Sequence, residues 1–147
     1  MLDVKQTAHE LESMLKDMVL NSGIFVPIGK DMIKYKKYTI IKLSDGTWAV
    51  FHNDVKKKHI ANTFLKVSAF AMCKLHEKRQ SLKISEIELQ DKIFEKNYVD
   101  SLVYKHTYKK TQDNMTRDTA LWRFEIAHAK AKHAKEIIDR LFYSSLT

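Results

Sequence analysis

The sequence predicts an α+β protein, mostly α, in which a β-hairpin of two or three strands packs on a helix and a long antiparallel helical hairpin follows. Three observations predict this class. The three glycines and the single proline all lie within the first 46 residues, so the rest of the chain contains no strong helix breaker. An Asp-Gly turn at 45–46 separates two runs of β-forming residues. From residue 120 onward, small and apolar residues recur with a helical period.

With 147 residues, 44% of them hydrophobic, the chain has the size of one compact domain or of a small domain with a helical extension. We expect a globular α-ββ(β)-α module over residues 1–80 and a helical hairpin arm over residues 81–147. The module should begin with an amphipathic helix from Asp3 to Leu20, because its apolar residues share one face. These residues are Val4, Ala8, Leu11, Leu15 and Met18. Residues 23–35 are predicted to form a connector that lies across the core, in which residues 24–26 can form a short strand that Pro27 confines to an edge or an end.

The hairpin is predicted from Thr39–Leu43 and Thr47–Phe51, which flank Asp45-Gly46. A two-residue type I′ turn at Asp45-Gly46 would pair Leu43 with Trp48. In that register the core face contains Ile41, Leu43, Trp48 and Val50, and the opposite face contains Tyr38, Ile40, Lys42, Ala49 and Phe51. Residues 56–61 can return as a third strand, whose register the sequence leaves open.

A helix is expected from about residue 62 to residue 79, with Phe64, Val67, Ala71 and Leu75 on its most buried stripe. The single cysteine, Cys73, lies on this helix and is interpreted as a packing residue.

In the last third, Ser85 and Glu88 fit a capping box that begins a helix reaching to about Lys110. A turn is predicted in "TQDNMTRD", and a second helix follows. Its seam alternates by four and three residues: Ala120, Phe124, Ala127, Ala131, Ala134, Ile138 and Leu141. Small seam residues permit close approach of a second helix. The partner is either the preceding helix, folded back, or the same seam in another copy of the chain.

The net charge of +8 is concentrated in residues 35–80, where ten Lys and Arg residues face three acids. Such asymmetry indicates an anionic partner. The candidate nucleic-acid-binding residues are Lys36, Lys37, Tyr38, Lys42, Phe51, Lys56, Lys57 and Lys58. The alternative interpretation is a solvated charge run with aromatic rings packed under the lysine stems.

No pattern in the chain predicts a catalytic, metal or cofactor site. The Glu-x-x-His spacing of Glu125 and His128 occurs once, whereas di-iron helical bundles need it twice with further carboxylates. There is no Gly-rich phosphate loop and no Cys-x-x-Cys pair. We therefore do not expect an enzyme.

Residues 35–80 contain a strand, the segment "DGTW" from Asp45, a second strand, a short basic strand and then "TFLKVSAFAMCKL". This order resembles the three-stranded-sheet-plus-helix DNA-binding domains of phage-type integrases and of plant ethylene-response factors. Those domains also show a DG-x-W hairpin and a Phe-initiated helix, here at Phe64. The resemblance implies DNA contacts from the exposed face of the sheet. The corresponding residues are Tyr38, Lys42, Phe51, Lys56 and Lys58.

The composition and the alanine-rich seam favour a non-enzymatic assembly or adaptor protein, similar in style to short phage-encoded proteins. Its helical arm would engage a protein partner or another copy of itself. The alternative is a nucleic-acid-binding protein that uses the basic, aromatic sheet at residues 35–60. No small-molecule substrate is evident. The N-terminus does not look like a signal peptide, and no apolar run approaches the roughly 18 residues of a membrane span. We expect a cytoplasmic, intracellular protein, or one associated with a virion.

Overall fold

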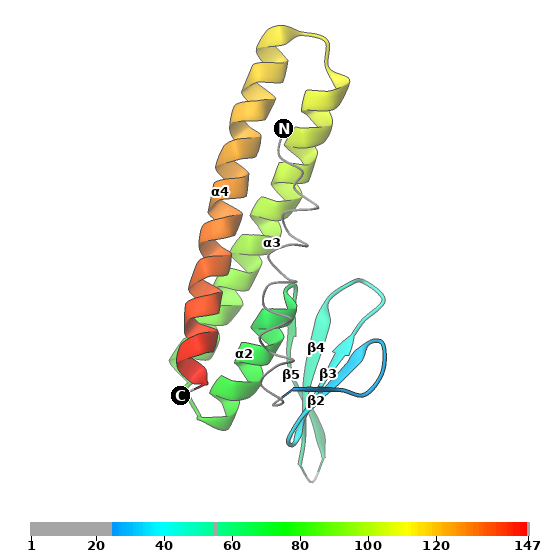
Figure 1. Ribbon diagram of the computed structural model, residues 1–147, viewed down its shortest axis with the longest axis vertical. Coiled ribbons are helices and arrows are strands. Elements are labelled where there is room, and N and C mark those ends of the chain that lie inside the picture. Colours follow the sequence, from blue (N-terminus) through cyan, green and yellow to red (C-terminus); the bar gives the residue numbers. More distant parts are fainter. Residues whose placement is uncertain (1–24, 55, 147) are drawn as a thin grey trace.

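The computed structural model describes residues 25–54 and 56–146 and has an antiparallel sheet, a helix packed on it and a long helical hairpin (Figure 1). The predicted α+β, mostly helical class is thereby confirmed. The strands are β1 (Val26–Pro27), β2 (Met32–Tyr35), β3 (Tyr38–Lys42), β4 (Trp48–Asn53) and β5 (Lys57–Thr63). The helices are α2 (Lys66–Glu77), α3 (Ser81–Lys110) and α4 (Asn114–Ser145). The helix expected at Asp3–Leu20 lies outside the described residues.

The sheet has five strands in the order of the sequence, each antiparallel to the next. β5 confirms the third strand, and β1 lies at the sheet edge, where Pro27 is tolerated. β2 replaces part of the expected connector. It buries Ile33 and Tyr35 and exposes Met32 and Lys34. An alternation of four residues is too short to separate a strand from a loop by pattern alone.

The β3–β4 hairpin has a three-residue loop at 44–46 in place of the expected two-residue turn. The backbone N–H of Leu43 donates to the Thr47 carbonyl at 2.8 Å, and that of Gly46 donates to the Leu43 carbonyl at 3.0 Å. Gly46 has φ +88°, the left-handed conformation that closes a three-residue hairpin loop. The Asp45 carboxylate accepts the N–H and the hydroxyl of Thr47 at 2.9 and 2.6 Å. These bonds hold the loop in its longer form.

The longer loop shifts the register by one residue and so exchanges the two faces of β3. Ile40 pairs with Val50, a position that the predicted register gave to Ile41. Ile40 and Val50 are fully buried, whereas the predicted core residues Ile41 and Leu43 are partly exposed. Trp48 packs at the edge of the core, on the side that was expected.

The pairing of β4 with β5 contains a shift between Val50 and Phe51. Beyond it Phe51 pairs with His59, and His52 pairs with Lys58. Such a bulge changes the direction in which the following side chains point. Because cross-strand partners share a face, Lys58 lies on the face of His52, and Phe51 lies on the opposite face with His59.

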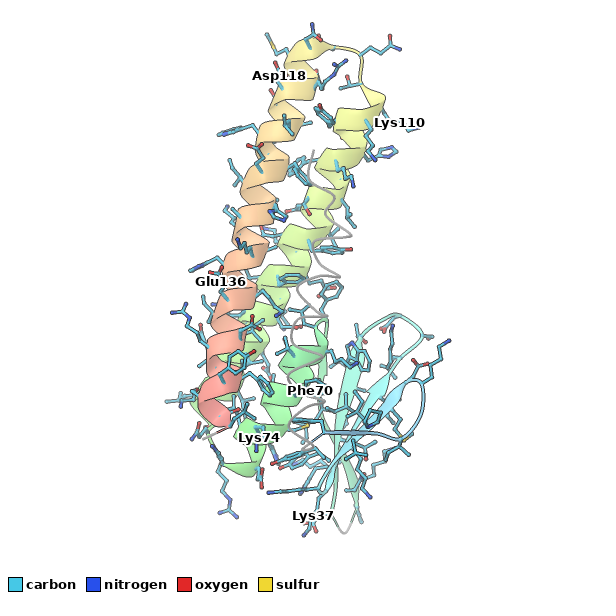
Figure 2. All side chains as sticks on the ribbon, viewed as in Figure 1. Lys37, Phe70, Lys74, Lys110, Asp118 and Glu136 are labelled. Atoms are coloured by element: carbon cyan, nitrogen blue, oxygen red, sulfur yellow. The ribbon has the colours of Figure 1, made fainter. Side chains whose placement is uncertain are left out.

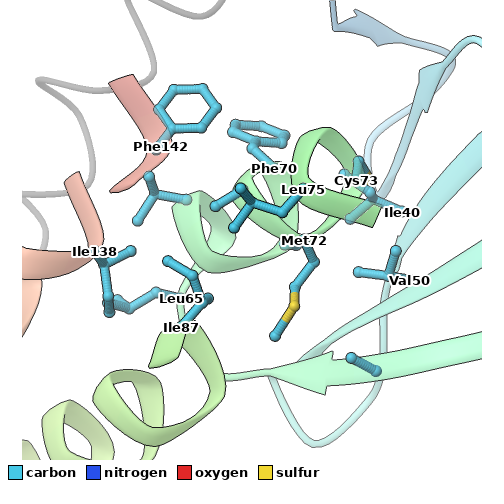
Figure 3. Close-up of a cluster of buried hydrophobic side chains, with 14 of the residues drawn as sticks. Ile40, Val50, Leu65, Phe70, Met72, Cys73, Leu75, Ile87, Ile138 and Phe142 are labelled. Carbon is cyan, nitrogen blue, oxygen red and sulfur yellow. The ribbon is translucent and has the colours of Figure 1, made fainter. Parts of the chain in front are cut away.

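The main core surrounds α2, which lies between the sheet and the helical hairpin (Figure 1) and is buried from Val67 to Leu75. Figure 3 shows the apolar cluster that joins the sheet to α2, α3 and α4: Ile40, Val50, Leu65, Phe70, Met72, Cys73, Leu75, Ile87, Ile138 and Phe142. Burial on both sides explains why α2 is apolar around most of its circumference. The expected helix start at residue 62 is wrong, because β5 extends to Thr63.

The arm is a packed antiparallel hairpin of α3 and α4, joined at residues 111–113 (Figure 1). The helix-interface residues Phe124, Ala127, Ala131, Ala134 and Ile138 are buried, and Leu141 is partly buried against the core. The preceding helix therefore covers the seam, which leaves no seam for another copy. The capping box is wrong: α3 begins at Ser81, and the Ser85 hydroxyl donates to the Ser81 carbonyl.

Candidate functional site

The structure divides the predicted nucleic-acid-binding residues among different surfaces. Tyr38 is 4% exposed and lies on the core side of the sheet. Phe51 is on the open side, where the Lys57 ammonium lies 4.5 Å from its ring centroid. The Lys42 ammonium lies 5.6 Å from the ring of Trp48. The predicted single basic, aromatic face is therefore wrong, and the reason is the register shift of the β3–β4 hairpin.

Three segments nevertheless bring cations to one end of the molecule. The β2–β3 loop carries Lys36 and Lys37, residues 56–58 are all lysine, and Lys78 and Arg79 follow α2. Figure 2 shows Lys37 at this end of the sheet, far from Lys110 at the end of the arm. We call residues 36–37, 56–58 and 77–79 the basic end. They contain two, three and two cations and a single carboxylate, that of Glu77.

Specific contacts hold the β2–β3 loop against β4 and α2, and strand pairing places Lys57 beside Asn53 and Lys58 beside His52. The backbone N–H of Asn53 donates to the Lys37 carbonyl at 2.6 Å, which fixes the β2–β3 loop against the end of β4. The Lys36 ammonium contacts the Glu77 carboxylate at 2.6 Å, which links the same loop to α2. The position of the cations is therefore set by the fold and not by one flexible segment.

A cleft of about 660 Å³ opens at the basic end, between the sheet, the end of α2 and the start of α3. It is lined by Lys36, Lys37, Tyr38, His52, His76, Glu77, Arg79, Ser81 and Ile84. The lysines and Arg79 supply positive charge, and Ile84 and the rings supply apolar surface. Because α3 begins at the cleft, the positive end of its helix dipole adds to the field there.

Three rings form one wall of the cleft. The Tyr38 hydroxyl and His76 Nδ1 are joined by a hydrogen bond of 2.6 Å. The His52 ring centroid lies 4.7 Å from that of Tyr38 and 5.4 Å from that of His76. Burial, with His52 and Lys58 nearby, lowers the pKa of His76 below its usual 6.5. Burial raises the pKa of Tyr38 to about 12. At neutral pH this wall is therefore uncharged at His76 and Tyr38.

The charge of Glu77 is already partnered. Its carboxylate accepts the Tyr35 hydroxyl and the Lys36 ammonium, and these hydrogen bonds lower its pKa. The buried Lys74 ammonium donates to the Tyr35 hydroxyl at 3.1 Å, and burial lowers the pKa of Lys74. Among the described residues, no carboxylate forms an ion pair with Lys37 or Arg79. Within this part of the chain no carboxylate competes with a bound anion for these two cations.

Two of the cleft cations have a strained backbone. Lys36 and Arg79 are the two described residues other than glycine with positive φ, at +47° and +56°. Arg79 is the first residue after the C-cap of α2. Its N–H donates to the His76 carbonyl, and the N–H of Gln80 donates to the Leu75 carbonyl. Glycine is the usual residue there, because it has no Cβ to clash. Strain of about 1 kcal/mol or more that a fold retains often marks a functional position.

The described residues offer little to other kinds of chemistry. No group of three or more His, Cys, Asp or Glu side chains in that part of the chain is placed to hold a metal ion. The Cys73 thiol is fully buried, and burial raises its pKa, so it is a packing residue as expected. None of the helices described combines the length and the apolarity that crossing a bilayer requires.

The sequence did not indicate that His52, His76, Glu77 and Arg79 belong to one site. They come from β4, the last turn of α2 and the loop after it, and no short motif joins them. Arg79 follows the helix at a position that commonly holds glycine, which is the one local signal that was present. Comparison of the chain with protein-family models, curated proteins and solved structures gave no match.

Proposed function

We propose that this protein binds nucleic acid through the basic end and has a binding role and not a catalytic one. The observation that carries the proposal is the convergence of seven cations from three segments, against two carboxylates, that of Glu77, which is already partnered, and that of Asp54 in the β4–β5 turn. Lysine and arginine side chains at fixed positions contact successive phosphates and release their counterions. The proposal differs from the sequence-based alternative, which used the face of the sheet.

The strained positions support the same role. A left-handed residue with a side chain costs roughly 1 kcal/mol relative to glycine. Among the residues that the structure describes, both such positions are occupied by cations, Lys36 and Arg79, and both line the cleft. An anion bound in the cleft gives a reason to retain these side chains in spite of that cost.

The direct test is a titration of labelled oligonucleotides with the purified chain at several salt concentrations. Affinity should fall at least about tenfold between about 50 mM and about 200 mM salt, because several phosphates are neutralised on binding. Absence of binding at the lower salt concentration to both single-stranded and duplex oligonucleotides would overturn the proposal.

A charge-matched pair of variants localises the site. Lys37→Ala with Arg79→Gly removes two cations of the cleft, and Lys109→Ala with Lys110→Ala removes two exposed cations at the far end of α3. The first variant should weaken binding and reduce the magnitude of the salt slope by about 2. The second should leave both nearly unchanged. Equal losses in the two variants would show that binding follows net charge and not the basic end.

A second candidate function, self-association through the outer surface of the arm, is favoured by apolar side chains in its distal half. Met115 is 79%, Trp122 62% and Val103 56% exposed. Aromatic residues and methionine are enriched at protein interfaces. A concentration-dependent sedimentation coefficient that Trp122→Lys removes would support this function. A sedimentation coefficient that stays constant up to a protein concentration of about 100 µM would exclude this function. The dissociation constant would then be well above that concentration, too weak for a stable assembly.

A further inference from the structure

We infer that the cleft at the basic end receives an unpaired nucleotide, so that single-stranded nucleic acid is bound in preference to duplex. This inference rests on the proposed function and adds the class of ligand. Its basis is the combination, in one concave site, of ring and aliphatic surface with two cations, Lys37 and Arg79, that form no ion pair among the described residues.

The size and the walls of the cleft fit one nucleotide. Its volume of about 660 Å³ lies within the range of sites that bind small organic molecules, roughly 300–1,000 Å³. One wall is the Ile84 side chain of α3, and another is formed by the rings of Tyr38, His52 and His76. His52 and His76, which are only partly buried, present ring surface that a nucleobase can contact, and Ile84 adds aliphatic surface.

The electrostatics of the cleft separate the two parts of a nucleotide. His76 and Tyr38 in the ring wall are neutral at pH 7, because the pKa of His76 is lowered and that of Tyr38 is raised. Lys37 and Arg79 line the cleft from two different segments, the β2–β3 loop and the residues after α2, and form no ion pair among the described residues. A base can therefore stack within the cleft while its flanking phosphates meet the cations.

Duplex nucleic acid can satisfy the charged part of this site but not the apolar part. In a duplex both faces of each base are covered by stacked neighbours, and the grooves present only base edges. Reading a groove also needs a protruding element, whereas this site is hollow. Duplex binding should therefore be limited to the phosphate contribution, and an unpaired base should add stacking to it.

Four ligands of one length and one label separate charge from stacking. These are single-stranded DNA, single-stranded RNA of the same sequence, the DNA duplex, and an abasic DNA strand that keeps the phosphates without bases. At equal salt, at least one of the single strands should bind fivefold or more tightly than both the duplex and the abasic strand, the lower limit expected from one stacked base. If all four bind equally, the inference is overturned while the proposed function stands. If none binds, both are overturned.

Two variants assign the preference to the cleft. His52→Asn removes a ring of the wall but no permanent charge, so it should lower the ratio of single-strand to duplex affinity. Lys37→Ala removes a phosphate contact, so it should weaken the binding of single strand and duplex by the same factor. The ratio of the two affinities should stay unchanged. Thermal unfolding checks that each variant is folded. If His52→Asn does not fold, Ile84→Ala replaces it, and the same ratio of single-strand to duplex affinity is measured. A ratio unchanged by the folded wall variant would overturn the placement of the base in this cleft.

Discussion

The carboxylate of Asp91, in the middle of the first half of α3, accepts the backbone N–H of Leu65, the residue that caps α2, at 3.0 Å. It also accepts the N–H of Phe64 at 2.7 Å. Leu65 has no side chain that can cap a helix, and no side-chain hydrogen bond is made by the α2 cap itself. The N-terminus of the central helix is thus capped by a different helix, 26 residues further along the chain.

Replacement of Asp91 by alanine should therefore destabilise the whole fold. Asp91 is 4% exposed, so its loss leaves two backbone N–H groups without their acceptor in the interior. We expect a decrease of about 2 kcal/mol in the free energy of unfolding. Urea denaturation measures it, with Glu88→Ala, at an exposed position of the same helix, as the control. A loss no greater than that of the control would contradict the capping role.

The two described glycines provide a test of the β3–β4 loop. Gly46 has φ +88°, and Gly29 has no atom within 4 Å of the position that a Cβ would occupy and no such φ. Gly46→Ala should lower the free energy of unfolding by about 1 kcal/mol because of backbone strain. Gly29→Ala should change it by less than about 0.5 kcal/mol. Thermal unfolding of both variants distinguishes them, and equal stabilities would argue against the left-handed conformation of Gly46.

The buried ion pair of α4 makes a third prediction. The side chain of Lys135 is 1% exposed, and its ammonium contacts the Asp139 carboxylate at 2.6 Å, one turn further along. Asp139→Ala leaves that ammonium buried without its partner, so we expect a loss of about 3 kcal/mol in unfolding free energy. Glu136→Ala, at the exposed neighbouring position, is the control. Adding Lys135→Met to the Asp139 variant should recover stability, and a further loss would contradict this account.

Stability should also depend on the protonation of His76. Burial lowers the folded-state pKa below 6.5, so near and below pH 6.5 the unfolded chain binds more protons than the folded one. The free energy of unfolding should therefore fall as the pH decreases from about 7.5 to about 5.5. His128, whose pKa is lowered chiefly by burial, contributes with the same sign.

His76→Asn isolates this effect from the other titrating groups. Asparagine retains an acceptor for the Tyr38 hydroxyl but does not titrate, so the pH dependence of stability should become shallower. Denaturation series at several pH values, on the parent chain and on this variant, measure the change in slope. An identical slope in the His76 variant would show that this residue is not the titrating group.

The arm was predictable because its signals are local and repeated. The seam from Ala120 to Leu141 lies on one helix, and its spacing of four and three residues repeats along that helix. The register of the hairpin was not predictable from Asp45-Gly46 alone. The same dipeptide closes a two-residue or a three-residue loop, and the hydrogen bonds from Thr47 to the Asp45 carboxylate favour the longer one. The one extra residue in the loop therefore determines which face of β3 is buried in the core.

The candidate site was less accessible to sequence reasoning than the fold. Local clusters of lysine were visible, but Tyr38 was assigned to the exposed face because of the register. The proximity of His52, His76 and Arg79 depends on how α2 crosses the sheet, and that packing brings together residues up to 27 positions apart. A single sequence carries no direct record of such long-range proximity.

The length of α3 has a mechanical consequence. Ser81 borders the cleft and Lys110 ends the same helix, 30 residues that at 1.5 Å per residue extend about 45 Å. Since α4 packs against this helix along its length, the pair of helices resists bending. Whatever touches the tip near residues 111–113 is then held at a set separation, about four and a half nanometres, from whatever occupies the opposite end. The helical hairpin therefore sets a fixed distance between the two ends of the molecule.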